Sequence, residues 1–232
     1  MQNEDKSLDL IGLGKLAKSI PEAVYLQTTE TVCRTFENLI APITETTSGL
    51  GRYIRQKFDN MVEVEKSLLA YALLNAKTKV ESNGRKLIVP RNPKSFVRAM
   101  EETAKEVDPL LNIMWTNLLA SQLSDEKCHP LFVQILSTLS PNEALLLDKL
   151  LPFEKIGNYA KNVLVRPYNL KKWSIKNGGE LYDWDLSCNI LCEFGLTNYV
   201  VPEPHIPGNG FVILWLTNTG KQFLDVVSGK DL

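Results

Sequence analysis

The fold is decided by the stretch Asp108–Leu123, which reads DPLLNIMWTNLLASQL. Asp108 supplies a side-chain acceptor at the N-cap position, and Pro109 suits the first helical position because its missing N–H would have no partner there. Leucine, isoleucine, methionine and tryptophan then occupy most faces of the helix that follows. A surface helix would keep a polar face, so this pattern predicts a central, buried helix.

Helical spacing of apolar residues also dominates the sequence before this stretch. An interrupted helical pattern runs from Pro21 to about Asn83, and we expect Gly49 and Gly51 to weaken it locally. The sequence Ser82–Gly84 has the composition of a helix stop. A further helix is predicted over Pro93–Glu106, after a connector that is too rich in proline to be helical.

Capping signals predict two short helices after the central one. His129 stands where an N-cap belongs, directly before Pro130, and is followed by an apolar run. Further on, Ser140-Pro141-Asn142-Glu143 has the order of a capping box, with proline at the first helical position.

Near Pro152 the pattern changes from helices alone to helices and strands. Asp183–Phe194 has the spacing of a helix. Two β-rich runs, Leu196–Val201 and Phe211–Leu216, are separated by a loop rich in proline and glycine, which is typical of a hairpin with a long tip. Thr217 is placed to cap a last helix.

Length and composition agree with a mainly α fold in two parts. The 232 residues are 44% hydrophobic and 23% charged, which suits one large domain or two small ones. The sequence predicts a helical domain over residues 1–139. Residues 140–232 are predicted to form a winged-helix-like α+β module with a short β-hairpin.

Charge and cysteine usage exclude several classes of protein. Lys and Arg number 26 against 27 Asp and Glu, so the global basic excess of many nucleic-acid binders is absent. The first residues are polar and acidic, and the longest apolar runs fall short of the roughly 20 residues that span a bilayer. The 4 cysteines are too scattered for a disulfide-rich secreted fold. We therefore expect a cytoplasmic protein without membrane association.

Motifs for catalysis and cofactor binding are weak. Gly12–Ala17 matches the dinucleotide pattern G-x-G-x-x-[GA] but lacks the alternating strands that the pattern requires. Cys188 and Cys192 could share a metal ion, although buried thiols explain them better. Cys128 precedes His129, but a helix cap explains this histidine better than a nucleophilic pair. We expect no cofactor and no metal, and the sequence argues against an enzyme.

The predicted winged-helix-like module lacks the charges of a DNA reader. Phosphate contacts need Lys and Arg on or near the recognition helix. The candidate helix, Trp184–Phe194, contains neither residue type and carries Asp185 and Glu193. The sequence therefore favours protein contacts or core formation by this module over DNA binding.

One stretch between residues 77 and 98 does concentrate positive charge, with Glu81 as its only acid. A solvated helix face is the simpler explanation of such a run, and a surface for a polyanion or an acidic partner is the more specific one. The basic residues are Lys77, Lys79, Arg85, Lys86, Arg91, Lys94 and Arg98.

The central segment resembles the signature of the abortive-infection alpha (Abi-alpha) family, which runs roughly NLLA…D…HPxFVxIxxxLSPxEA. The resemblance implies a role in bacterial phage defence, in which an infected cell stops growing or dies before the phage completes its cycle. It implies no catalytic residue or cofactor, and structural roles are sufficient for its residues. These are Asn117, Leu118, Leu119, Asp125, His129, Pro130, Phe132, Ser140, Pro141 and Glu143.

The resemblance and the charge pattern together give three functional hypotheses. The first is a phage-defence protein that acts through macromolecular interaction, with a host or phage protein as its partner. The second is a winged-helix DNA-binding regulator of a defence or prophage locus. The third is a toxic effector with a cryptic hydrolase or nuclease site.

Overall fold

The computed structural model confirms a mainly helical chain. The chain divides into two compact units, Met1–Val133 and Gln134–Leu232, which are described separately. The division lies within helix α8 (Pro130–Leu136), a little before the predicted boundary at Leu139. The residues described are 34, 36–38, 48–124, 128–150, 166–169, 181–200 and 211–228.

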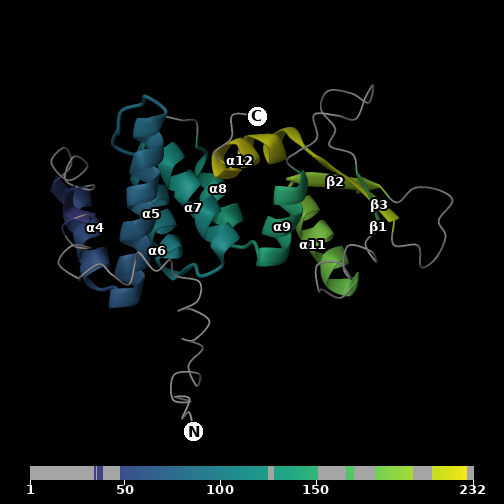
Figure 1. Cartoon of the computed structure of the whole chain (residues 1–232), viewed down its shortest axis with the longest axis horizontal. Coiled ribbons are helices and arrows are strands. Elements are labelled where there is room, and N and C mark those ends of the chain that lie inside the picture. Colours follow the sequence, from purple (N-terminus) through teal and green to yellow (C-terminus); the bar gives the residue numbers. More distant parts are fainter. Residues whose placement is uncertain are drawn as a thin grey trace, which may run out of the picture. The chain divides into compact units, whose positions relative to one another are not determined.

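Three helices of the first unit pack against one another in pairs (Figure 1). They are α5 (Glu63–Ser82), α6 (Pro93–Lys105) and α7 (Pro109–Gln122). Helix α4 (Ser48–Asp59) precedes them. The largest side chains of the shared core come from all three packed helices: Leu69, Leu73, Phe96, Met100, Trp115, Leu118 and Leu119.

The predicted helical pattern before residue 83 has an interruption that the sequence does not indicate, and the expected weakening at two glycines is not seen. Gly49 and Gly51 lie inside α4, and the chain instead leaves helical structure between Asp59 and Glu63. The α5 start is favoured there because the Val62 N–H faces Glu65 Oε2 at 3.4 Å. Most of the pattern before Ser48 lies outside the described residues.

The predicted helix stop after Ser82 is confirmed. Gly84 takes a positive φ of 68°, which costs glycine little. Its N–H donates to the Glu81 carbonyl oxygen at 3.0 Å. The next N–H, that of Arg85, donates to the Val80 carbonyl oxygen at 3.1 Å. These two bonds form a Schellman motif, which satisfies carbonyl groups at the end of α5.

The predicted start of α7 is also confirmed, but its burial is incomplete. Asp108 Oδ1 accepts the N–H groups of Leu110 and Leu111, each at 3.0 Å. Most of the helix is buried between its neighbours, whereas Ile113 is 57% exposed. The apolar pattern predicts burial on most faces of the helix. It does not show that the side of α7 with Ile113 is left uncovered by the described helices.

The second unit combines helices with a three-stranded antiparallel sheet of order β1-β3-β2. The predicted hairpin is formed by β2 and β3, whose register pairs Thr197 with Leu216 and Val200 with Ile213. The predicted hairpin tip lies outside the described residues. The elements are α9 (Pro141–Leu150), β1 (Arg166–Asn169), α11 (Leu181–Glu193), β2 (Thr197–Val200), β3 (Phe211–Leu216) and α12 (Asn218–Ser228).

A close backbone contact fixes the start of α12 against the end of α11. Gly195, at φ 66°, ends α11 in a second Schellman motif. The next residue, Leu196, accepts the Thr217 N–H at 3.0 Å through its carbonyl oxygen. Thr217 Oγ1 accepts the Gly220 N–H at 2.9 Å, which confirms the predicted cap of the last helix. A Cβ at Gly220 would lie 1.9 Å from the Leu196 oxygen, so this contact needs glycine.

The Gly220→Ala substitution should therefore destabilise the second unit by at least about 2 kcal/mol, because neither backbone can yield without loss of these bonds. Denaturant unfolding followed by circular dichroism measures the change.

Gly49→Ala provides the matched control, because a Cβ at this helical glycine meets nothing within 4 Å. This substitution should leave stability unchanged or raise it by up to about 1 kcal/mol. Equal effects of the two substitutions would contradict the role of the Leu196 contact.

Candidate functional site

Most apolar residues of the central signature lie in the core or begin helices. Leu118 and Leu119 are fully buried on α7, and Phe132 on α8 is 3% exposed. Pro130 and Pro141 are the first residues of α8 and α9. These positions explain the residues by packing and helix initiation. Asp125 lies outside the described residues.

His129 makes the cap that the sequence predicts for α8. Its Nδ1 accepts the N–H of Leu131 at 3.1 Å. The imidazole also meets the Phe132 ring edge-on, with 6.2 Å between ring centroids. Nδ1 acts as the acceptor in this bond, which is the role of a helix N-cap.

The predicted cap at the start of α9 is present, with the Ser140 side chain bound one position earlier than in a standard capping box. The Ser140 N–H donates to Glu143 Oε2 at 2.6 Å. In return, Ser140 Oγ accepts the N–H of Asn142 at 3.3 Å. Glu143 is 2% exposed, and this bond satisfies one of its oxygens in the interior.

Asn117, the remaining polar member of the signature, pairs with a lysine that the sequence groups with a surface patch. Lys79 Nζ on α5 donates to Asn117 Oδ1 on α7 at 2.6 Å. Lys79 is only partly exposed, and Asn117 is 6% exposed. The structure thus assigns Lys79 to a contact between two helices. Lys79 is therefore less exposed than the basic residues between positions 85 and 98.

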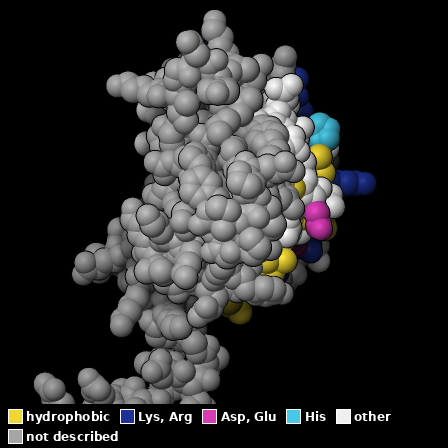
Figure 2. Space-filling view, turned by 90° about the vertical axis from the view of Figure 1, so that its right-hand side faces the viewer, with side chains coloured by type: hydrophobic (Ala, Val, Ile, Leu, Met, Phe, Trp, Pro, Cys, Tyr) yellow, Lys and Arg dark blue, Asp and Glu magenta, His cyan; other side chains and the backbone are white. Residues whose placement is uncertain are grey.

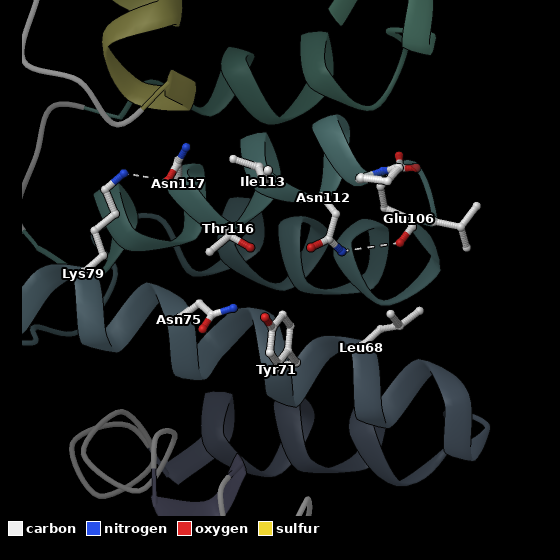
Figure 3. A pocket seen from close by; sticks show the side chains of 11 residues that line it. Leu68, Tyr71, Asn75, Lys79, Glu106, Asn112, Ile113, Thr116 and Asn117 are labelled. Carbon is white, nitrogen blue, oxygen red and sulfur yellow. Dashed lines mark hydrogen bonds between the residues drawn. The ribbon is translucent and has the colours of Figure 1, made fainter. Parts of the chain in front are cut away.

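The two residues form one end of a pocket of about 380 Å³ between α5 and α7. Figure 3 shows Lys79 and Asn117 at this end and Leu68 and Glu106 at the other. We call it the α5–α7 pocket. Its lining residues are Leu68, Tyr71, Asn75, Lys79, Glu106, Val107, Pro109, Asn112, Ile113, Thr116 and Asn117.

The opposite end of the α5–α7 pocket is organised by Glu106. Its backbone carbonyl oxygen accepts Asn112 Nδ2 at 3.4 Å, and its Oε1 accepts the Asp108 N–H at 2.8 Å. Burial raises the pKa of the Glu106 carboxyl, while the bond from Asp108 opposes the rise. The carboxyl is thus already engaged in the turn that leads into α7.

The other basic residues between 77 and 98 do not form a uniform surface. Lys77 Nζ lies 3.8 Å from Glu81 Oε1, and Arg98 Nε lies 3.9 Å from Glu102 Oε1. Part of the positive charge is therefore compensated by carboxylates on the same helices. Arg85 is exposed beside the end of α5. The remaining exposed residues, Lys86, Arg91 and Lys94, follow the chain from α5 into α6, and we call them the basic connector.

Backbone bonds hold the basic connector in place. The Ile88 N–H donates to the Leu123 carbonyl oxygen at the end of α7, at 2.9 Å. At the other end, Asn92 Oδ1 accepts the Ser95 N–H at 3.0 Å and caps α6. The three cations are therefore presented from a fixed backbone rather than from a loose loop.

Charge elsewhere is mixed. In the narrow strip of described side chains that Figure 2 shows, basic, acidic and hydrophobic groups lie next to one another. Helix α11, the candidate recognition helix, carries Asp183, Asp185 and Glu193 and contains no Lys or Arg. This composition opposes contact with phosphate groups.

Two of the described cysteines, Cys128 and Cys192, lie in surroundings that suppress thiolate chemistry. Burial raises the pKa of Cys128 to about 12. Burial also raises the pKa of Cys192, whose Sγ lies 3.4 Å from Thr197 Oγ1. A neutral thiol is a poor nucleophile and a poor metal ligand. Within the described ranges, no group of three or more His, Cys, Asp or Glu could hold a metal ion.

Comparison with known proteins identifies a family. The family model described as abortive infection alpha matches residues 64–227. No curated protein and no solved structure matches the chain. In the part of the chain that the structure describes, no helix has both the length and the apolar character needed to cross a membrane.

The His129 cap can be tested by two substitutions. His129→Ala removes the acceptor and should lower the free energy of unfolding by about 1 kcal/mol. His129→Asn should keep most of the stability of the parent chain, because asparagine is a good N-cap. Denaturant unfolding measures both values. Complete loss of function in a stable His129→Asn variant would instead indicate a chemical role for the imidazole.

Proposed function

This chain belongs to the abortive infection alpha family, and we propose that it acts in phage defence through contact with another macromolecule. The partner is a host or phage protein with an acidic surface, and the compartment is the cytoplasm. Family membership supports the defence role in general. The basic connector is the observation that carries the proposed mode of action.

The charge of the basic connector supports an acidic partner. Lys86, Arg91 and Lys94 are exposed, and their segment contains no carboxylate between residues 85 and 94. Exposed like charges raise the association rate with an oppositely charged surface and help to select the correct partner. The anchored backbone reduces the ordering cost of binding, because the segment already has a defined conformation.

Structural roles account for the polar signature residues better than catalysis does. His129, Ser140 and Glu143 are engaged in helix caps, and Asn117 binds Lys79. Their chemistry is therefore used within the fold. The alternative of a cryptic hydrolase or nuclease site would need reactive groups other than these.

We also propose that the second unit is a winged-helix-like module used for protein contacts. The contacts of α11 with α9 and β2, and the β2–β3 hairpin, support this interpretation. The acidic composition of α11 favours a protein over DNA as the partner.

Reversal of the basic connector tests the mode of action. The triple variant Lys86→Glu, Arg91→Glu and Lys94→Glu should fold normally, because all three side chains are exposed, and should lose phage protection. Plaque counts with and without expression, together with host survival, measure protection.

A second triple variant controls for net charge. Arg34, Arg55 and Lys105 are also exposed in the first unit, and their replacement by glutamate changes the total charge by the same amount. This variant should retain protection. Full protection in the connector variant would show that its charge is only solvated surface.

The regulator hypothesis has its own test. Titration of the chain against duplex DNA in a gel-shift assay at low salt should give no complex at micromolar protein. A shifted complex that dissociates as salt rises would contradict the protein-partner proposal and favour a DNA-binding regulator.

A further inference from the structure

The middle of the α5–α7 pocket is polar but uncharged. Thr116 of α7 and Asn75 of α5 line this part and lie opposite each other in Figure 3. The charged residues stand toward the two ends, where Lys79 donates to Asn117 and the Glu106 carboxyl accepts a backbone N–H. Both charged groups are thus engaged within the fold, and the neutral pair in the middle is the part of the pocket to consider for a ligand.

Thr116 lacks the hydrogen bond that the threonines of the two neighbouring helices make. The Thr78 hydroxyl on α5 donates to the Leu74 carbonyl oxygen at 2.9 Å, and the Thr103 hydroxyl on α6 donates to the Ala99 carbonyl oxygen at 2.6 Å. Each of these bonds reaches back four residues along its helix. Within the described residues, the Thr116 hydroxyl has no such partner, although Thr116 is only 9% exposed. A buried hydroxyl without a partner is unfavourable, and a ligand in the pocket would supply one.

Asn75 adds a second neutral group on the facing helix. Its side chain is half-buried, and no hydrogen bond engages its amide within the part of the chain that the structure describes. An asparagine amide both donates and accepts hydrogen bonds, and so does a threonine hydroxyl. The pair is therefore complementary to a head group that is uncharged and that donates and accepts as well, such as a hydroxyl or a carboxamide.

Apolar side chains surround this pair and reach the surface. Ile113 is 57% exposed and Val107 is 38% exposed, and both line the pocket. On α5, the partly buried Tyr71 packs against Leu68, which also lines it. Covering these groups with an apolar body would be favourable because apolar area would leave water.

We propose that the α5–α7 pocket binds a small uncharged molecule, with a hydroxyl or carboxamide head between Thr116 and Asn75 and an apolar body along Ile113 and Val107. This inference goes beyond the proposed defence function and does not depend on it. The head is defined by the two neutral polar groups and the body by the apolar side chains.

The size of the pocket favours a small molecule over a protein segment. Its volume of about 380 Å³ is in the range of small-molecule sites. Helices α5 and α7 pack directly against each other, so the space between them is a recess rather than an open groove for a whole helix. Tyr71 contributes an aromatic ring, which suits an aromatic body.

A matched series of aromatic compounds tests the class of ligand. Benzyl alcohol and benzamide carry neutral heads, benzoate and benzylamine carry charges at neutral pH, and toluene has no polar head. In titrations of the full chain followed by NMR chemical shifts, the alcohol or the amide should bind saturably at millimolar concentration. The charged compounds should bind roughly tenfold more weakly or less, because a charge would lose hydration beside neutral groups. Toluene should bind roughly fivefold more weakly, because it leaves the hydrogen bonds unmade.

Two threonine substitutions locate the head group. Thr116→Val keeps the shape of the side chain, and it should reduce affinity for the neutral-headed probes by roughly fivefold while toluene binds as before. Thr78→Val is the matched control, because Thr78 lies on α5 outside the pocket lining, and this variant should bind every probe as the parent does. Ile113→Ser, at an exposed position, should weaken all the bound probes alike, including toluene.

Unfolding of the unliganded chain gives an independent readout. Thr116→Val should leave the denaturant midpoint unchanged or raise it, since no hydrogen bond among the described residues is lost. Thr103→Val should lower the midpoint, because it removes a bond that is made. An equal loss of stability in the two variants would show that the Thr116 hydroxyl serves the fold and would contradict the proposal.

The binding experiments overturn the proposal if neither neutral-headed probe saturates at millimolar concentration, or if benzoate, benzylamine or toluene binds as tightly as they do. Full affinity in a folded Thr116→Val variant would also overturn it. If that variant does not fold, the ranking of the probes on the parent chain and the Ile113→Ser variant still decide the question. Phage protection is not a readout here, so failure of the defence proposal is distinguishable from failure of this one.

Discussion

Burial of α7 is the constraint on which the first unit depends. A helix that is buried along most of its length loses stability when its end groups lack partners, so specific bonds are needed at its ends and toward its neighbours. Asp108 satisfies the start, and the Ile88 N–H binds the carbonyl oxygen of Leu123 at the end. Asn117 binds Lys79 of α5, and Gln122 Nε2 donates to Ser95 Oγ of α6 at 2.9 Å. These bonds fix α7 against both neighbours.

The sequence predicts the parts of the fold that depend on local chemistry. The caps at Asp108, His129 and Thr217 involve residues that are close in the chain, so side-chain type and order suffice to find them. The exposure of Ile113 depends on which side of α7 its neighbours cover, and periodicity does not contain that information. The break between α4 and α5 was also missed, because apolar spacing continues across it.

The two candidate surfaces also differ in whether the sequence can predict them. The basic connector could be found from composition, since its cations are close in sequence and remain exposed in the fold. The α5–α7 pocket could not be found, because Lys79 and Asn117 are separated by 38 residues and meet only through helix packing. Each of the two residues has a plausible separate role in the sequence, Lys79 as surface charge and Asn117 as a signature position. A signal such as paired substitution at the two sites in related chains would have linked them.

The bonds around Leu196 have a consequence for how the second unit opens. The amide of Leu196 is bound to the Leu191 carbonyl oxygen at 3.0 Å, and the Leu196 carbonyl is bound to Thr217. One residue therefore belongs at once to the end of α11 and to the start of α12. Local opening of the last helix would release a backbone group that also belongs to the earlier one. We infer that α11, the hairpin and α12 exchange their amide hydrogens as a single cooperative segment.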